Sequence, residues 1–374
     1  MANAEKKRIK SWFMQNIILP NNEIIDKPGF IIYQFNEQDK NAFMREVLVP
    51  ETILADIESR AVREFGEKGH RALYRAGKRW GYRFANGALF PQFSKSSEKD
   101  VLDFLAAFTK VIEAEYSEKF AHELDFKRRV VTFRGDNMVI CKYSGDGGIF
   151  LGAWVGCWAY QNDDPTFEGV QSECQGRKDK QCVFVCGPRS EIKVKEDIPL
   201  DESSRIEAPQ FYSLNSPAHA ARSDFSLKRF MELGHITYDG GFFRFGNERL
   251  VLNESSYLYF MGDELGKIGA EDVIFESAFD YFSEFAKNHT REFFIGFLMA
   301  SGFGQVEILK ERKGYSARIR NYPWTSMAKK AGFPLIRGMI SGYLSGKEGR
   351  KVALKNFTSS TADGRLDIIM RERI

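Results

Sequence analysis

The sequence predicts an α+β fold made of two tandem copies of one helix-rich domain, in which antiparallel β-hairpins flank a helix. The order of helical and alternating apolar patterns in residues 30–187 recurs in residues 227–374. The glycine pair of GAWVG recurs in GMISG, and such a spacing lets a helix lie close against its neighbour. A length of 374 residues also suits two domains.

The first copy shows three helical patterns before its strands. A strand is expected near residue 30, and the third helix begins with the capping pattern Ser97-x-x-Asp100. Alternation after it predicts a hairpin that turns at Gly135–Asn137. The predicted helices cover 50–66, 66–87, 97–126 and 149–160, and the predicted strand pairs cover 128–145 and 166–187.

The second copy repeats this order. It begins with a strand pair, continues with a helical region, and closes with a hairpin, a helix and a last strand pair. The predicted strand segments are 242–252, 304–321, 351–357 and 364–370, and the predicted helical segments are 257–267, 270–302 and 326–346.

Two segments lie outside the copies. Residues 1–29 form an N-terminal extension, and residues 188–226 form a linker that is rich in proline and charge. No apolar run reaches the length of a membrane-spanning helix, and the start of the chain lacks the cleavage pattern of a signal peptide. We therefore expect a cytoplasmic protein.

Composition narrows the classes of function. Apolar residues make up 43% and charged residues 28%, which is globular rather than disordered. A net charge of only +3 argues against direct nucleic-acid binding. The 33 phenylalanines can fill large cores or line apolar pockets. All five cysteines lie between Cys141 and Cys186, in a chain that fits a reducing compartment, so this cluster needs a local explanation.

The segments LYRAGKRWG, GAWVG and ECQGRKDKQCVF, together with the helix–hairpin–helix order, resemble the 4-vinyl reductase domain family. That family is related to the aromatic-sensing domains of bacterial regulators and to the subunits of the TRAPP trafficking complex. The resemblance covers about residues 45–187, and residues 227–374 match it as a degenerate copy. It implies a fold of the NO-signalling and Golgi-transport type that encloses a small apolar ligand and often dimerises.

The resemblance also implies a zinc site built on Cys174 and Cys182. The related sensors add a Glu three residues before the first cysteine, where this chain has Gln171, and an upstream Cys. The upstream position falls near 147–149, which holds no Cys, so a complete site would have to recruit Cys141 or Cys157. Zinc is therefore one expectation, beside buried free thiols and a redox-labile Cys174–Cys182 pair.

Aromatic side chains at helical spacing are the candidates for ligand binding. We expect a cavity between the helix that carries Trp80 and Phe84 and the helix that carries Trp154 and Trp158. Tyr74 is the nearest polar group that could orient a ligand. Packing into the core is the alternative for each of these residues.

No motif in the sequence indicates catalysis. There is no Gly-rich dinucleotide loop between a strand and a helix, no phosphate-binding loop that ends in Gly-Lys-Ser/Thr, and no cluster of histidines. The sequence therefore predicts a non-catalytic sensor or regulatory adaptor that binds a small apolar or aromatic molecule, forms a homodimer and acts through a protein partner. Two alternatives remain: an enzyme or accessory factor of tetrapyrrole or vinyl-group metabolism, and a structural adaptor of the trafficking type.

Overall fold

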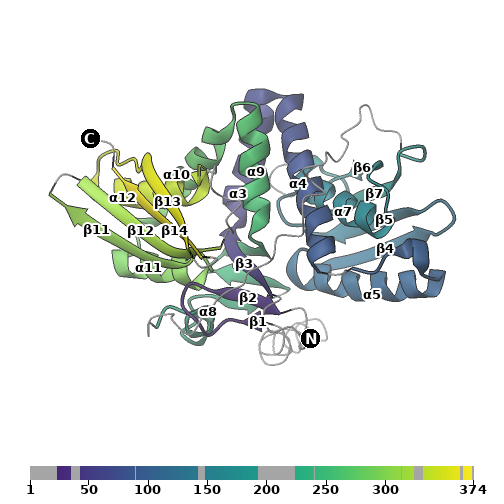
Figure 1. The fold of residues 1–374 in the computed structure, drawn as a ribbon, viewed down its shortest axis with the longest axis horizontal. Helices are drawn as coiled ribbons and strands as arrows, with labels where there is room; N and C mark the ends of the chain where they lie inside the picture. Colours follow the sequence, from purple (N-terminus) through teal and green to yellow (C-terminus); the bar gives the residue numbers. More distant parts are fainter. Residues whose placement is uncertain are drawn as a thin grey trace.

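The computed structural model describes residues 23–34, 43–88, 90–141, 148–192, 224–239, 241–312, 314–323, 332–362 and 365–372. These residues form an α+β fold with antiparallel sheets, as the sequence predicts. Figure 1 shows one four-stranded sheet at each end of the long axis, with long helices and a third sheet between them.

Three strands, three long helices and a strand–helix–strand unit follow one another in the first half. Its strands are β1 (Glu23–Ile24), β2 (Ile31–Gln34), β3 (Phe43–Pro50), β4 (Lys119–Asp125), β5 (Val130–Asp136), β6 (Phe167–Glu173) and β7 (Cys182–Pro188). Its helices are α3 (Glu51–Phe65), α4 (Glu67–Gly87), α5 (Glu98–Glu115) and α7 (Gly148–Gln161), with short 3-10 turns η2 (Phe93–Lys95) and η3 (Gln175–Arg177).

The second half repeats this order after a short helix, α8 (Leu227–Glu232). Its strands are β8 (Thr237–Asp239), β9 (Phe242–Phe245), β10 (Glu248–Glu254), β11 (Gln305–Glu311), β12 (Gly314–Tyr322), β13 (Asn356–Ala362) and β14 (Arg365–Arg371). Its helices are α9 (Ser256–Lys267), α10 (Glu271–Phe285), α11 (Arg291–Ala300) and α12 (Pro334–Glu348).

The sheets show the same duplication. The sheet of the first half has the strand order β4-β5-β7-β6, and the sheet of the second half has the corresponding order β11-β12-β14-β13. In each half, one helix, α7 or α12, lies between the two hairpins in the chain. The predicted recurrence of a helix between two hairpins is therefore present in the second half.

Both halves contribute to the third sheet, whose strand order is β1-β2-β3-β10-β9-β8. Its middle pair, β3 and β10, joins the halves in antiparallel register, with Leu48 opposite Leu252. Helix α4 packs against α9, and α3 packs against α10. We call this contact of β3, α3 and α4 with β10, α9 and α10 the seam. It makes the chain a dimer-like arrangement of its own two halves (Figure 1).

Glycines explain how the helices pack within each half. A Cβ on Gly152 or Gly156 would lie 2.1 Å from a backbone oxygen of α4, that of Tyr74 or Lys78. The equivalent contacts in α12 are 2.3 Å for Gly338 and 2.2 Å for Gly342, to backbone oxygens of α10. A side chain at any of these positions would force the helices apart, so the recurring glycine pair sets the same close helix contact twice.

The structure corrects two expectations for the first half. Helix α5 does begin with the predicted capping box at Ser97, but it ends at Glu115 rather than near 126. Tyr116 stops it, because its backbone carbonyl accepts from Val139 N–H and its hydroxyl donates to Leu252 O across the seam, at 2.9 Å in both cases. Residues 119–125 are a strand, and the hairpin turns at 126–129 instead of at Gly135–Asn137.

The predicted segments outside the two copies can be compared with the structure only in part. Strand β1, which the sequence places in the 1–29 extension, pairs with β2. Most of the 188–226 linker, and residues 326–331 of a predicted helix, lie outside the described residues. Within the described ranges, no helix has both the length and the apolar character that crossing a membrane requires.

Candidate functional site

Three cysteines from different parts of the first half meet in one cluster. The sulfur atoms of Cys141, Cys174 and Cys182 all lie within 4.8 Å of one another, and all three side chains are buried. Cys174 follows β6, Cys182 begins β7, and Cys141 ends the turn that follows β5. Three sulfur ligands at such distances are a donor set that zinc prefers, so the cluster could hold a metal ion.

Hydrogen bonds fix the loop that carries Cys174. Cys174 N–H donates to Asp179 Oδ2 at 2.8 Å, and Cys174 Sγ lies 3.6 Å from Cys141 O. Gln175 N–H points to Cys182 Sγ at 3.5 Å. The eight residues between β6 and β7 therefore form a compact turn that brings Cys174 and Cys182 to the same point.

The three thiols do not ionise alike. Hydrogen bonds from Cys141 and Cys182 lower the pKa of Cys174 to about 2, against the effect of burial. The hydrogen bonds to Cys174 and Cys182, with burial, raise the pKa of Cys141 well above its usual value. A hydrogen bond from Cys141 lowers the pKa of Cys182, but its bond to Cys174 and burial raise that pKa to about 11. The directions of these pKa shifts therefore favour a thiolate at Cys174 that accepts hydrogen bonds from two protonated thiols.

The side chain of Gln171, on β6, lies beside this cluster. Its amide nitrogen lies 3.4 Å from Cys141 Sγ. This is the position that the family resemblance gives to a ligating Glu. An amide oxygen at the same place is a weaker ligand than a carboxylate, so the residues fit a metal held mainly by three thiolates.

The remaining two cysteines lie elsewhere. Cys157 on α7 donates to Gly81 O at 3.2 Å, and burial raises its pKa to about 12. Cys186 on β7 lies beside Gly169, and burial raises its pKa strongly. Of the two candidates for the upstream ligand, the fold therefore recruits Cys141 and not Cys157.

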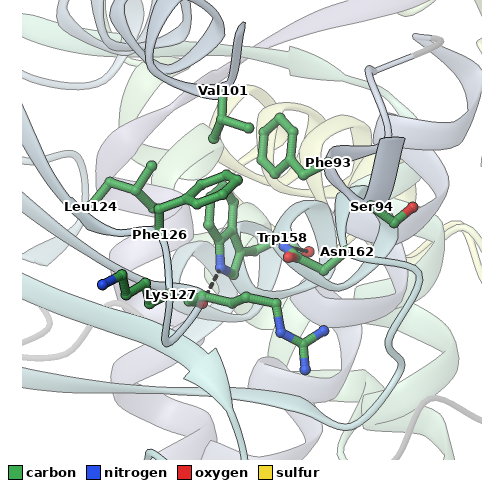
Figure 2. A pocket seen from close by; sticks show the side chains of 9 residues that line it. Phe93, Ser94, Val101, Leu124, Phe126, Lys127, Trp158 and Asn162 are labelled. Carbon is green, nitrogen blue, oxygen red and sulfur yellow. Dashed lines mark hydrogen bonds between the residues drawn. The ribbon is translucent and has the colours of Figure 1, made fainter. Parts of the chain in front are cut away.

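A cavity of about 330 Å³ opens at the other end of the same sheet. It lies between α5, the β4–β5 turn and the end of α7 (Figure 2). Its walls are mostly apolar and aromatic, with polar groups at a few points, as in many small-molecule sites. The lining residues are Phe93, Ser94, Val101, Leu124, Phe126, Lys127, Arg129, Trp158 and Asn162.

Trp158 forms one wall of this cavity. Its ring packs against Phe93 with centroids 5.0 Å apart, and its indole N–H donates to Arg129 O at 3.0 Å, the dashed line in Figure 2. The Arg129 guanidinium lies 3.4 Å from Asp164. The indole is thus held in place by its own hydrogen bond, and its face remains as an apolar surface.

The other predicted ring positions lie apart from this cavity. Trp154 packs among Phe120, Phe133 and Phe184, with the closest centroid at 4.5 Å. Helices α4 and α7 meet backbone to backbone along their glycines, so Trp154 points to the sheet rather than to α4. The space between the two helices is therefore filled by their own backbones where the glycines meet.

Trp80 and Phe84 face the seam. Trp80 donates its indole N–H to Glu254 at 3.2 Å and packs against Tyr257 at 5.5 Å, both in the second half. Phe84 packs on Trp80 and on Phe90. Trp80 thus contributes to the contact between the halves, and Phe84 packs against Trp80.

Tyr74 belongs to a buried polar group. Its hydroxyl donates to Glu168 at 2.6 Å and accepts from Gly169 N–H at 3.1 Å. Lys78 forms an ion pair of 2.8 Å with the same carboxylate, and the two side chains are at most 2% exposed. Burial, and then the charge of Glu168, raises the pKa of Tyr74 well above its usual value.

Sequence reasoning identified Trp158 but missed the other eight residues that line this cavity. For Leu124 and Phe126 the reason is that the sequence predicts a helix up to residue 126, where the structure has a strand and its turn. For the cysteine cluster, the sequence offers Cys141 and Cys157 as possible additions to Cys174 and Cys182, and the structure brings Cys141 to them. The confinement of all five cysteines to residues 141–186 is the sequence signal for this cluster.

Comparisons with known proteins give structural likeness but no family match. No protein-family model matches the chain, and no curated protein matches it. A crystal structure of the phenol-responsive sensory domain of the transcription activator PoxR, with phenol, is similar over 54% of this chain and 98% of that chain. The identity is 13% and the TM-score is 0.34. Membership of the 4-vinyl reductase family is therefore not shown.

Proposed function

We propose that this chain is a non-catalytic small-molecule sensor whose first half binds an apolar or aromatic ligand in the cavity beside Trp158. The observation that carries this proposal is the cavity itself, which combines aromatic walls with few polar groups. Its ionisable lining residues are two cations, Lys127 and Arg129, which do not make the acid and base pair that proton transfer needs.

The cavity also indicates how a ligand would lie. A ring would contact Trp158, Phe93 and Phe126, and its burial is worth about 25 cal/mol for each Å² of apolar surface removed from water. A polar end of the molecule would meet Lys127, whose side chain is exposed. The proposal includes the cytoplasmic location, the homodimer and the regulatory protein partner that the sequence leads us to expect.

The cysteine cluster supports a second part of the proposal, a structural zinc ion. Cys141, Cys174 and Cys182 would hold it, with the Gln171 side chain beside the fourth position. A zinc ion there would supply no chemistry to a ligand at Trp158, because the cluster and the cavity lie at opposite ends of β5, which spans about 20 Å. Its role is to pin the loops that follow β5 and β6 to the start of β7.

Fluorine NMR of protein labelled with 5-fluorotryptophan tests the ligand site. The chain has five tryptophans, and Trp158→Phe assigns the signal of interest by its loss. Phenol, toluene, phenylacetate and protoporphyrin are the compounds to titrate. We expect at least one of them to shift the Trp158 signal and to leave the Trp154 signal, from the packed core, in place.

Two results would contradict this site. If no compound shifts any signal at millimolar concentration, the sensor proposal fails. If the Trp80 signal moves while that of Trp158 does not, ligand binding belongs to the seam. Lys127→Ala should weaken the phenylacetate complex, while Lys119→Ala on the far end of the same hairpin is a matched control for the loss of surface charge.

Cobalt substitution tests the metal site. Co²⁺ bound by thiolates gives an intense charge-transfer band, whose strength follows the number of sulfur ligands. Replacing Cys141, Cys174 or Cys182 by Ser should reduce the band and the affinity, whereas Cys157→Ser and Cys186→Ser are matched controls from buried positions outside the cluster. Gln171→Glu should tighten binding, because a carboxylate is a better ligand than an amide. Wild-type protein without the band would overturn the metal part of the proposal.

A further inference from the structure

The turn that delivers Cys141 has an uncommon backbone. Asn137 has φ of +52° and Ile140 has φ of +59°. A left-handed conformation is tolerated by Asn, but it is a genuine outlier for a β-branched residue such as Ile. Such a conformation persists only when its surroundings hold it in place. The residues that hold this turn therefore decide where the Cys141 sulfur lies.

The main contact to this turn comes from the other half of the molecule. Arg249 on β10 donates to Asn137 O at 2.8 Å and to Met138 O at 3.4 Å. The same guanidinium forms a bidentate pair with Glu51, at the start of α3. Glu51 in turn accepts from the N–H of Ile140, the residue directly before Cys141. Arg249 and Glu51 are both buried, so this contact is shielded from water.

On its other side, the turn is tied to the cysteine loop. Asn137 N–H donates to the side-chain oxygen of Gln175 at 2.6 Å, and Gln175 follows Cys174 directly. The turn is thus fixed between the second half, through Arg249, and the loop that carries Cys174. A shift at either side would move Cys141 relative to the other two sulfur atoms.

The chain contains a matched contact with no cysteine beside it. Arg45 on β3 reaches in the opposite direction across the seam and donates to Asn321 O at 3.2 Å and to Gly302 O at 3.1 Å. Asn321 has φ of +57°, like Asn137. Arg45 lies 4.2 Å from the centre of the Phe30 ring, and Arg249 lies 4.3 Å from that of Phe242. No cysteine follows Asn321, because the second half has none.

We propose that Arg249 is a positioning residue for the metal site, so that the second half completes the site of the first. By holding Asn137, Met138 and Glu51, it keeps Cys141 within reach of Cys174 and Cys182. Metal affinity in the first half then depends on the seam, and metal binding stabilises the seam by the same free energy. This inference rests on the metal site proposed above.

Cobalt titration of the full chain tests it, with Arg249→Met compared with Arg45→Met. Losing a contact that orients a ligand costs about 10–100-fold in metal affinity, which we expect for Arg249→Met. Its charge-transfer band should weaken toward that of Cys141→Ser, because one thiolate is lost. Arg45→Met should keep the wild-type band and an affinity within about twofold of wild type, although it breaks an equivalent buried contact. Arg249→Lys should restore the band in part, since Lys can still donate to a backbone carbonyl but cannot form the bidentate pair.

Each outcome bears on one proposal. An Arg249→Met protein with wild-type affinity and band would overturn the inference and leave the metal site in place. Equal weakening by both arginine variants would also overturn it, because general destabilisation would then explain the loss. Absence of the band in wild type would overturn the metal site, and the inference with it. If Arg249→Met does not fold, Glu51→Gln removes one charge of the pair at nearly constant volume, and the same comparison with Arg45→Met applies.

Discussion

The two halves share a topology but differ in what fills it. The first half has eight residues between β6 and β7, which carry Cys174, whereas only two residues join β13 to β14. In the first half, the α4 residues that contact the α7 glycines are Tyr74 and Lys78, whose side chains bind Glu168. In the second half, the α10 residues that contact the α12 glycines are Phe275 and Phe279. The core of the second half is packed with phenylalanines, among them Phe294, which stacks on Tyr343 at 4.1 Å.

This difference distinguishes the features that determine the fold from those that could serve a function. The glycine contacts, the strand orders and the seam are common to both halves, so they are sufficient for the fold. Among the described residues, the cysteine cluster, the cavity at Trp158 and the Lys78–Glu168 ion pair lie in the first half, so the fold of the second half forms without them. We therefore assign the candidate sites to the first half and treat the second half as its structural counterpart.

Glycine substitution should have the largest effect, and the same effect in both halves. Gly156→Ala and Gly342→Ala each place a Cβ at about 2.1–2.2 Å from a backbone oxygen of the neighbouring helix. We expect each to cost at least about 3 kcal/mol, or to prevent folding, because two helix backbones must separate. Urea denaturation measures this. A variant that loses little stability would show that the shared helix contact is not what sets the fold.

Breaking the buried Lys78–Glu168 ion pair should have the next largest effect, and the α10 residues at the corresponding positions are Phe275 and Phe279. Lys78→Met leaves the Glu168 charge buried without its partner and should cost about 3–5 kcal/mol. Lys78→Met combined with Glu168→Leu should cost less than Lys78→Met alone, because the apolar second half shows that this topology tolerates apolar residues. Denaturation of both variants at one pH measures the difference. A double variant that is less stable than Lys78→Met would contradict this reasoning.

Proton release on metal binding tests the ionisation of the cysteine cluster, and the second half has no cysteine that could contribute to it. The raised pKa values of Cys141 and Cys182 leave both protonated at neutral pH, whereas Cys174 is already a thiolate. Binding by three thiolates then releases two protons, so zinc affinity should rise about 100-fold for each unit of increasing pH. Calorimetry in buffers of different ionisation enthalpy counts the protons. Release of none or of three would show that the ionisation of the cluster differs from this description.

The smallest effect should come from a glycine that touches nothing. Gly262 lies within α9, and a Cβ there would meet no atom within 4 Å. Gly262→Ala should therefore stabilise the protein by about 0.5–1 kcal/mol, since Gly is a poor helix former. The sign is opposite to that of Gly156→Ala, and thermal denaturation of the two variants side by side tests it. Destabilisation by Gly262→Ala would mean that α9 has a contact at this point.

Local patterns in the sequence were sufficient for the element order. Apolar spacing predicted α3, α4, α7 and the β6–β7 pair, and the capping pattern at Ser97 marked the start of α5, because these features depend on neighbours a few residues away. The end of α5 was wrong for the opposite reason. Tyr116 stops that helix through a bond to Leu252, a residue of the other half that no local pattern can indicate.

The sequence by itself determined the α+β class, the repeated order of elements and the Cys174–Cys182 pair as a metal candidate. Only the tertiary structure decided that Cys141 joins that pair, that Trp158 lies at a cavity while Trp154 and Tyr74 lie in packed interiors, and that Arg249 reaches the turn before Cys141. The physical reason is distance along the chain. Periodicity is set by bonds between near neighbours, whereas a site is made of residues tens or hundreds of positions apart, which only the packing of helices on sheets brings together.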